Sequence, residues 1–165
     1  MQSHKFFALG FIILLCGACQ DQVVFTKYQS FSKAWSSTDT LNFNFEAPDT
    51  IHPHHMFFST RLNENFEFNN LYLIASISFP NGKRITDTLE YQMAHPDGSL
   101  MGSGFGSVKE SKLWYKSDVI FIEPGEYQVK VRQAMRRNGE IVAIDALKGV
   151  LDFGLHLERA IRVKN

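Results

Sequence analysis

Apolar and polar residues alternate at period two through much of the chain, and this alternation predicts β-strands with one buried face. In "TLNFNFE", residues 40–46, Leu41, Phe43 and Phe45 lie on the same side of the predicted strand. The alternation recurs in three longer segments: "LYLIASISF" at 71–79, "EYQVKVRQAM" at 126–135 and "LDFGLHLE" at 151–158. The chain is therefore predicted to be built mainly from half-buried strands.

Two further segments have strand character without the same clean alternation. In "HHMFFSTRL", residues 54–62, the apolar run 56–58 predicts a strand that is buried on both sides. "RITDTLEY", residues 84–91, is predicted to be another strand, which brings the expected total to about eight. "SVKESKLWYK", residues 107–116, has loosely spaced apolar residues, and we expect a connection there with one or two helical turns.

Turn-forming residues separate these segments, at Pro-Asn-Gly 80–82, Pro-Asp-Gly 96–98, Pro-Gly 124–125 and Asn-Gly 138–139. The Asn-Gly pair favours a two-residue hairpin turn, because both residues tolerate positive φ angles. Short strands joined by regular turns predict an all-β fold, a two-sheet β-sandwich for which a jelly-roll arrangement is one option. Since no repeat or linker divides the chain, residues 23–165 are expected to form a single domain.

The N-terminus carries the features of an export signal. One charge, Lys5, precedes an apolar run at 6–15 that is too short to cross about 30 Å of hydrocarbon. Both cysteines of the chain follow, with small residues between them in "CGAC", and this resembles a bacterial lipobox in which Cys19 takes the lipid. Cys16 stands where a lipobox usually has Leu, so simple secretion remains the alternative. We expect a signal-peptide helix in residues 1–18 and a lipidated tether at 19–22.

Composition narrows the range of partners. Removal of residues 1–18 leaves about 147 residues, the size of one ordinary domain. The whole chain has 17 basic and 17 acidic residues, and loss of Lys5 leaves a net charge of about −1. A net charge near −1 gives no excess of positive charge for binding the phosphates of nucleic acid. Because no cysteine follows Cys19, the domain must be stabilised by its core rather than by disulfides.

Motifs for cofactors and metals are weak. "GSGFGS", residues 102–107, has neither the spacing of a dinucleotide fingerprint nor the Lys-Ser/Thr pair of a P-loop, so we interpret its glycines as a tight bend with Phe105 packed beneath it. His52, His54 and His55 are potential ligands, but no paired carboxylate or helical His motif accompanies them. We interpret them as solvated loop histidines, and we expect no metal, no cofactor and no catalytic residue.

Two groups of residues are candidates for binding a partner. Phe105, Trp114 and Tyr115 lie in one loop-rich stretch, where they would form a surface patch if exposed or fill the core if buried. Arg132 and Arg136 lie beside the predicted hairpin at 136–141, as a solvated turn or as a partner contact. Trp35, Trp114 and Tyr115 would form a platform for stacking on sugars if they were exposed, although such residues more often fill a core.

The segment "DTLEYQMAHPDGSLMGSGFGSVKESKLWYK", residues 87–116, resembles the most distinctive part of the gliding-motility lipoprotein family GldH of Bacteroidota. Further segments occur in the order found in that family: "FSKAWSSTD", "NLYLI", "FPNGK", "YQVKVRQAMRRNG" and "LKGVLDFGLHLE". The resemblance covers about residues 23–158. "IHPHHM", residues 51–56, is not part of this pattern.

The resemblance implies a non-enzymatic envelope lipoprotein anchored through Cys19. It would be a component or assembly factor of the gliding motility and type IX secretion machinery and would bind other envelope proteins. We expect attachment to the outer membrane. Because "QDQ" after Cys19 lacks an acidic run of the kind that marks surface export, we expect the domain to face the periplasm. Two other functions remain open: a carbohydrate-binding lipoprotein of the polysaccharide-uptake type, and a hydrolase that uses the histidines as metal ligands.

Overall fold

The structure is a computed structural model that describes residues 22–161, so the predicted signal peptide and Cys19 lie outside the described residues. Within this range all regular structure is β, and no helix is long and apolar enough to cross a membrane. The strands are β1 (Val23–Ser30), β2 (Trp35–Ser36), β3 (Leu41–Glu46), β4 (His54–Leu62), β5 (Asn70–Ser78), β6 (Arg84–Gln92), β7 (Lys109–Val119), β8 (Glu126–Gln133), β9 (Ala146–Leu147) and β10 (Val150–Arg159).

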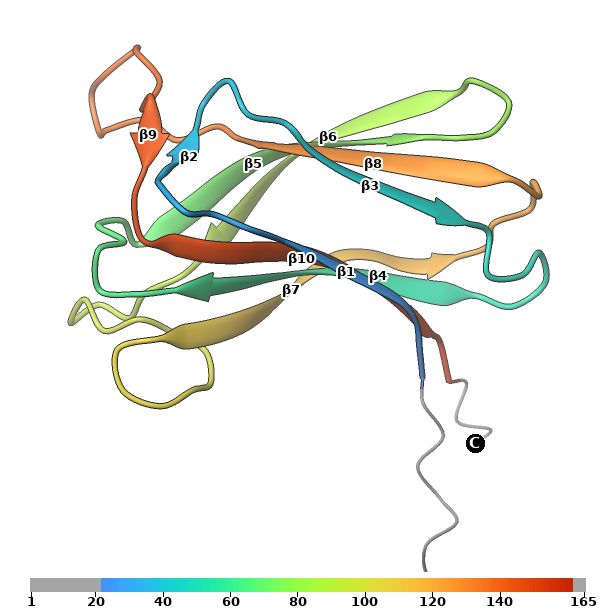
Figure 1. The fold of residues 1–165 in the computed structure, drawn as a ribbon, viewed down its shortest axis with the longest axis horizontal. Helices are drawn as coiled ribbons and strands as arrows, with labels where there is room; N and C mark the ends of the chain where they lie inside the picture. The colour runs from blue at the N-terminus through green and yellow to red at the C-terminus, as the bar shows by residue number, and fades with distance from the viewer. Residues whose placement is uncertain (1–21, 162–165) are drawn as a thin grey trace, which may run out of the picture.

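Two four-stranded antiparallel sheets lie face to face (Figure 1). Sheet A has the order β1-β10-β4-β7, sheet C has the order β3-β8-β5-β6, and the short strands β2 and β9 form a separate two-stranded ladder. Without the short strands β2 and β9, eight long strands remain, and they pair from the outside of the sequence inward: β1 with β10, β3 with β8, β4 with β7 and β5 with β6. This nested pairing is the jelly-roll arrangement, and it confirms the predicted two-sheet sandwich.

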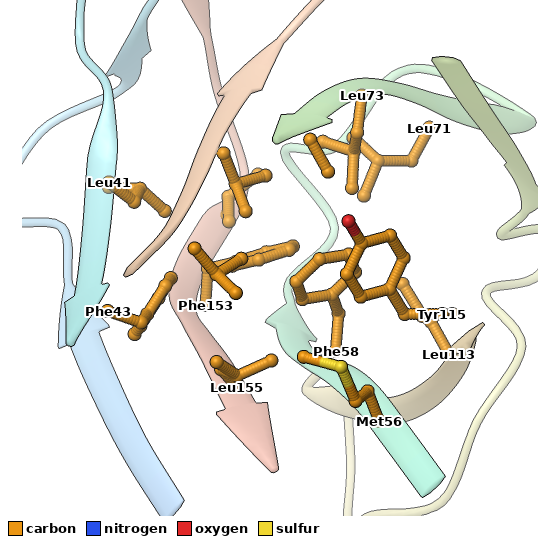
Figure 2. Packing of buried hydrophobic residues seen from close by; sticks show 14 of the residues in the cluster. Leu41, Phe43, Met56, Phe58, Leu71, Leu73, Leu113, Tyr115, Phe153 and Leu155 are labelled. Carbon is orange, nitrogen blue, oxygen red and sulfur yellow. The ribbon is translucent and has the colours of Figure 1, made fainter. Parts of the chain in front are cut away.

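The core is an aromatic layer between the two sheets (Figure 2). Phe153 on β10 is fully buried and packs against rings from both sheets, with centroid distances of 5.2 Å to Phe58 and 6.5 Å to Phe43. The ring of Trp35 lies 5.2 Å from the same phenyl group. Because these four rings come from β2, β3, β4 and β10, burial of one side chain joins segments that are far apart in the sequence.

The six segments named as strands in the sequence are all present, as β3, β4, β5, β6, β8 and β10, and the structure has ten strands where about eight were expected. Burial alternates strictly along β3, as the period-two pattern requires. The apolar run in β4 is buried on both faces: Met56 and Phe58 are fully enclosed in the core, and Phe57 is only 6% exposed on the outer face. The alternation was therefore a sufficient signal wherever one face of a strand meets the core and the other meets water.

One predicted connection is wrong. Residues 107–116 were expected to hold a helical turn, but most of them belong to β7, which pairs with β4 along its length. Leu113 and Tyr115 face the core, while Trp114 points to the outer face and covers Phe57. Three apolar residues in succession hid the period-two pattern, because the outward residue of this strand is also apolar.

The predicted turns are present, with one difference in type. Gly82 and Gly98 donate backbone hydrogen bonds of 2.9 Å that close the turns at 79–82 and 95–98. At the Asn-Gly pair, Glu140 N–H donates to Arg137 O at 3.0 Å, but only Gly139 has a positive φ. The chain therefore does not form the expected hairpin turn with two positive φ angles, and this loop is longer than a two-residue connection.

Replacing a central core ring should be far more costly than replacing an exposed one. We expect Phe153→Ala to lower the free energy of unfolding by about 3–5 kcal/mol, because it removes the ring shared by both sheets and leaves a cavity. Phe105→Ala makes the same chemical change at a fully exposed position, and it should shift stability by no more than about 0.5 kcal/mol. Urea denaturation followed by circular dichroism measures both, and equal losses would contradict this view of the core.

Candidate functional site

The structure separates the three aromatic residues that were predicted to form one patch. Phe105 is fully exposed in the loop between β6 and β7, and Trp114 is half exposed on the outer face of sheet A. Tyr115 is buried, stacked on Phe58 at 4.6 Å, with its hydroxyl donating to Asp87 Oδ2 at 3.2 Å. Neighbouring residues of a strand point to opposite faces, so the Tyr115 side chain belongs to the core and the predicted patch is not formed.

The glycine-rich loop at 101–108 is fastened to the start of β7. Ser103 and Glu110 exchange backbone hydrogen bonds of 2.9 and 2.7 Å. A Cβ atom at Gly102 would lie 2.3 Å from Glu110 O, and one at Gly104 would lie 2.4 Å from Val108 O, so only glycine allows the backbone to approach this closely. The predicted tight bend is correct, but Phe105 is not packed beneath it. The loop instead presents this ring to solvent from a fixed backbone.

Trp114 lies against other rings rather than standing free. Its ring is 4.6 Å from Phe57 at an interplanar angle of 88°, and 5.0 Å from the imidazole of His55. Its carbonyl oxygen accepts a hydrogen bond of 2.8 Å from the Tyr91 hydroxyl. Because Glu110 pairs with Ser103 at the base of the glycine-rich loop, Trp114 lies four residues further along β7, about 13 Å away. Phe105 and Trp114 are therefore separate surface features.

The two predicted arginines lie on the other sheet. Arg132 is on the outer face of sheet C, where its strand position pairs with Ile74. Arg136 follows β8 and helps to line a surface hollow of about 340 Å³ whose other walls are Tyr72, Ile74, Thr88 and Ala134. Within residues 22–161 neither guanidinium forms an ion pair. Arg136 thus borders a mainly apolar depression, and Arg132 lies beside Ile74 of the same depression through strand pairing.

A polar network on the outer face of sheet A was not predicted. Asp152 accepts hydrogen bonds from Ser30 Oγ at 2.5 Å and from Arg61 Nε at 2.6 Å, and it forms an ion pair with the same guanidinium. These residues come from β1, β10 and β4, and strand pairing places them in one row across the sheet. Asp152, Arg61, Tyr28 and Glu110 line a hollow of about 340 Å³.

Tyr28 connects this hollow to a second row of side chains. Its hydroxyl donates to Glu110 Oε1 at 3.1 Å and lies 2.9 Å from His156 Nε2. The ring packs over Gly154, where a Cβ atom would be 2.7 Å from Tyr28 Cδ1. Burial raises the pKa of Tyr28, and burial together with the nearby Lys112 lowers the pKa of His156. Both groups are therefore neutral at pH 7, and they hold each other in place.

The histidine segment is not the solvated loop that we expected. His52 is half exposed, but His54 is fully buried, and neither of its ring nitrogens has a hydrogen-bond partner. The His54 ring lies 5.6 Å from the ring of Phe121, and its Nε2 is 3.8 Å from Asp49 Oδ2. His54 is buried because β4 begins with this residue and turns its side chain into the end of the core.

Asp49 organises this corner. Its carboxylate accepts backbone hydrogen bonds from His52 at 2.7 Å and Ile51 at 2.9 Å, and it pairs with Arg159 at 3.2 Å. The two backbone donors hold the pKa of Asp49 well below its usual range. Within residues 22–161 no group of three or more His, Cys, Asp or Glu side chains is arranged to hold a metal ion.

The chain is similar to known proteins over most of its length. A family model described as GldH lipoprotein matches residues 23–157. The chain is 42% identical over 154 residues to the "Gliding motility lipoprotein GldH homolog" of Christiangramia forsetii, covering 93% of this chain and 94% of the relative. It is 43% identical over 146 residues to the "Gliding motility lipoprotein GldH" of Flavobacterium johnsoniae, covering 88% of this chain and 91% of the relative.

One solved structure, the VP2 subviral particle of infectious bursal disease virus, aligns with a TM-score of 0.36 and 14% identity. The alignment covers 81% of this chain and 32% of the viral chain.

Burial of His54 should make the protein less stable in mild acid. Burial lowers the pKa of His54 in the fold, so the unfolded chain takes up a proton at a higher pH than the folded chain does. The resulting stability is present above pH about 6.5 and is lost as the pH falls through the folded pKa. We expect His54→Leu to flatten the dependence of the urea midpoint on pH between about 7 and 5.

His52→Leu is the matched control, since His52 is half exposed in the same segment, and it should keep the wild-type dependence on pH. His156 contributes a residual slope in all variants, because burial also lowers its pKa. A wild-type slope in His54→Leu would show that another group controls acid stability.

Proposed function

This chain belongs to the GldH lipoprotein family, and we propose that it is a non-enzymatic, lipid-anchored component or assembly factor of the gliding motility and type IX secretion machinery. Family membership supports a gliding-motility lipoprotein of the cell envelope. In this proposal the lipid is attached to Cys19, the membrane is the outer membrane and the domain faces the periplasm. The protein acts by contacting other envelope proteins.

The polar network on sheet A supports a non-enzymatic role. The Asp152 carboxylate is bound to Ser30 and Arg61, and Tyr28 is bound to both Glu110 and His156. Each of these groups has a hydrogen-bond or ion-pair partner within the sheet, so structural contacts account for the network. Their arrangement is suited to fixing the outer face of the sheet.

Presentation of Phe105 is the observation that supports protein contacts most directly. The Phe105 ring is fully exposed, and large aromatic side chains are frequent anchors at interfaces because a partner that covers them buries much apolar area. The loop backbone is already fixed by Gly102, Gly104 and the pairing of Ser103 with Glu110. Binding through this ring would therefore require little ordering of the chain, which favours affinity.

Carbohydrate binding is the second candidate. Trp114 and Tyr28 are 52% and 41% exposed on the outer face of sheet A, and Tyr28 is itself part of the polar network. They lie on β7 and β1, three strand intervals or about 14 Å apart, and do not form one stacking platform. Glycan binding that is abolished by Trp114→Ala would favour this function over protein contacts.

Substitution of the proposed lipidation site should release the protein. Cys19→Ser removes the thiol that would carry the lipid, so we expect an unprocessed precursor or a soluble protein. Membrane fractionation with mass spectrometry of the N-terminus distinguishes these forms from the wild type. Cys16→Leu is the control, because Leu is the usual lipobox residue there, and it should be processed and anchored normally. A processed, membrane-bound Cys19→Ser protein would refute the assignment.

Loss of the exposed ring should weaken partner binding without changing the fold. We expect Phe105→Ala to cost about 2 kcal/mol or more of binding free energy, roughly 30-fold in affinity, because it removes a proposed interface anchor. Crosslinking and pull-down from native envelopes, quantified by mass spectrometry, measures recovery of each partner.

Trp114→Ala serves as the comparison for this experiment, since it removes a half-exposed ring from a different surface. Full recovery of all partners with Phe105→Ala would contradict the role of the loop. Loss of partners with Trp114→Ala alone would assign the contact to the outer face of sheet A.

A further inference from the structure

Exposed isoleucines surround the end of the sandwich at which β1 begins. In sheet A His54 pairs with both Val119 and Arg159, so the start of β4 and the ends of β7 and β10 lie together (Figure 1). A backbone hydrogen bond of 2.9 Å from Ala160 N–H to Pro53 O extends this contact. The four exposed isoleucines of the adjoining segments, here called the isoleucine fringe, are Ile51 (75% exposed), Ile122 (71%), Ile161 (59%) and Ile120 (44%).

The fringe is held on fixed backbone in two of its segments. Phe121 lies between Ile120 and Ile122, is fully buried, and packs 4.9 Å from the ring of Tyr127. Because this ring points into the core, its two neighbours are turned outward. Ile51 donates its backbone N–H to Asp49 Oδ1 at 2.9 Å, within the corner that Asp49 organises. The isoleucines are therefore presented to solvent by the fold itself.

The tether places this end close to the proposed lipid. Val23 pairs with Glu158, and Gln22 O accepts a hydrogen bond of 2.8 Å from Arg159 N–H, so the chain joins the fold beside the fringe. Cys19 precedes Gln22 by three residues, which can span at most about 10 Å. If Cys19 carries acyl chains, as proposed above, Gln22 cannot lie further than this from the surface of the bilayer.

We propose that the isoleucine fringe inserts into the interfacial region of the lipid bilayer, so that the sandwich stands on the membrane at this end. This inference rests on the proposed anchor at Cys19. Apolar side chains gain free energy when they enter the boundary between headgroups and acyl chains, and a short tether keeps the fringe within reach of that boundary. The lipid and the fringe would then hold the domain in one orientation.

The charges near the fringe favour apolar insertion over attraction to anionic lipid. Arg159 is paired with Asp49, and Glu123 accepts hydrogen bonds from Asn81. His52 shares the carboxylate of Asp49. Since basic and acidic groups are present together, the described residues 22–161 provide no excess of positive charge at this end for a phosphate surface. Contact with the bilayer should accordingly persist at high salt.

The opposite end supplies a matched control. Ile141 is 88% exposed in the loop that follows β8, and β8 leads from the fringe end to that loop (Figure 1). The eight residues of β8 span about 26 Å, so Ile141 stands well above the membrane in the proposed orientation. It has the same side chain as Ile122 and comparable exposure, but it lies at the wrong end for insertion.

The test uses the full, processed and lipidated protein with Ile122→Cys or Ile141→Cys. Each substitution introduces the only thiol available for labelling with an environment-sensitive fluorophore, because the lipid occupies Cys19. The labelled proteins are reconstituted into vesicles of phosphatidylethanolamine and phosphatidylglycerol with brominated acyl chains. We expect blue-shifted, bromolipid-quenched emission from position 122 at low and high salt, and unquenched emission from position 141.

Flotation of the vesicles distinguishes a failure of fringe insertion from a failure of the proposed lipid anchor at Cys19. If both proteins float but position 122 is quenched no more than position 141, the fringe does not enter the bilayer and the lipid anchor still holds. If neither protein floats, the anchor at Cys19 is wrong and the inference falls with it. Shielding of position 122 in native envelope fragments but not in pure lipid would show that a protein, rather than lipid, covers the fringe.

Discussion

Contact between aromatic rings of the two sheets is the interaction on which the rest of the structure depends. The domain has no disulfide after Cys19 and no helix within residues 22–161 to cover its sheets, so each sheet can bury its apolar face only against the other. Phe153 joins rings from β2, β3 and β4 at the centre of this layer. The pairing of the first strand with the last follows the same logic, because sheet A is completed only when β10 is inserted between β1 and β4. Stability is thus cooperative across nearly the whole chain, and the loops and outer faces are left free to vary.

This division between core and surface explains what could be predicted from the sequence. Strands with one buried and one solvent-exposed face were recognised from the alternation of apolar and polar residues alone. The number and spacing of these strands then predicted a two-sheet sandwich, with a jelly roll as one possible arrangement. The signal failed where both faces have the same character. β7 carries Trp114 on its outer face, and β1 is an edge strand with most of its side chains exposed. Neither strand therefore shows a clean period of two.

Surface sites were harder to predict, because they depend on strand pairing rather than on local pattern. "LDFGLHLE" shows that Asp152 and His156 face away from the core, but not that β1 and β4 bring Ser30, Tyr28 and Arg61 beside them. The expected aromatic patch failed for the opposite reason, since closeness in sequence places Trp114 and Tyr115 on opposite faces of one strand. Phe105 was the exception. Its flanking glycines marked a fixed loop, although only the structure shows that the ring points outward.

The topology itself gives the molecule two unlike ends. Pairing of β1 with β10 brings the start and the finish of the domain to one end, and the glycine-rich loop between β6 and β7 lies at the other (Figure 1). A lipid attached a few residues before β1 would therefore set the polarity of the whole sandwich. With the fringe in the interface, the strands stand between the bilayer and Phe105, and a strand of this fold spans about 26 Å. A partner that binds this ring would have to offer its pocket at roughly that height, so the short tether would select partners by distance from the membrane as well as by surface chemistry.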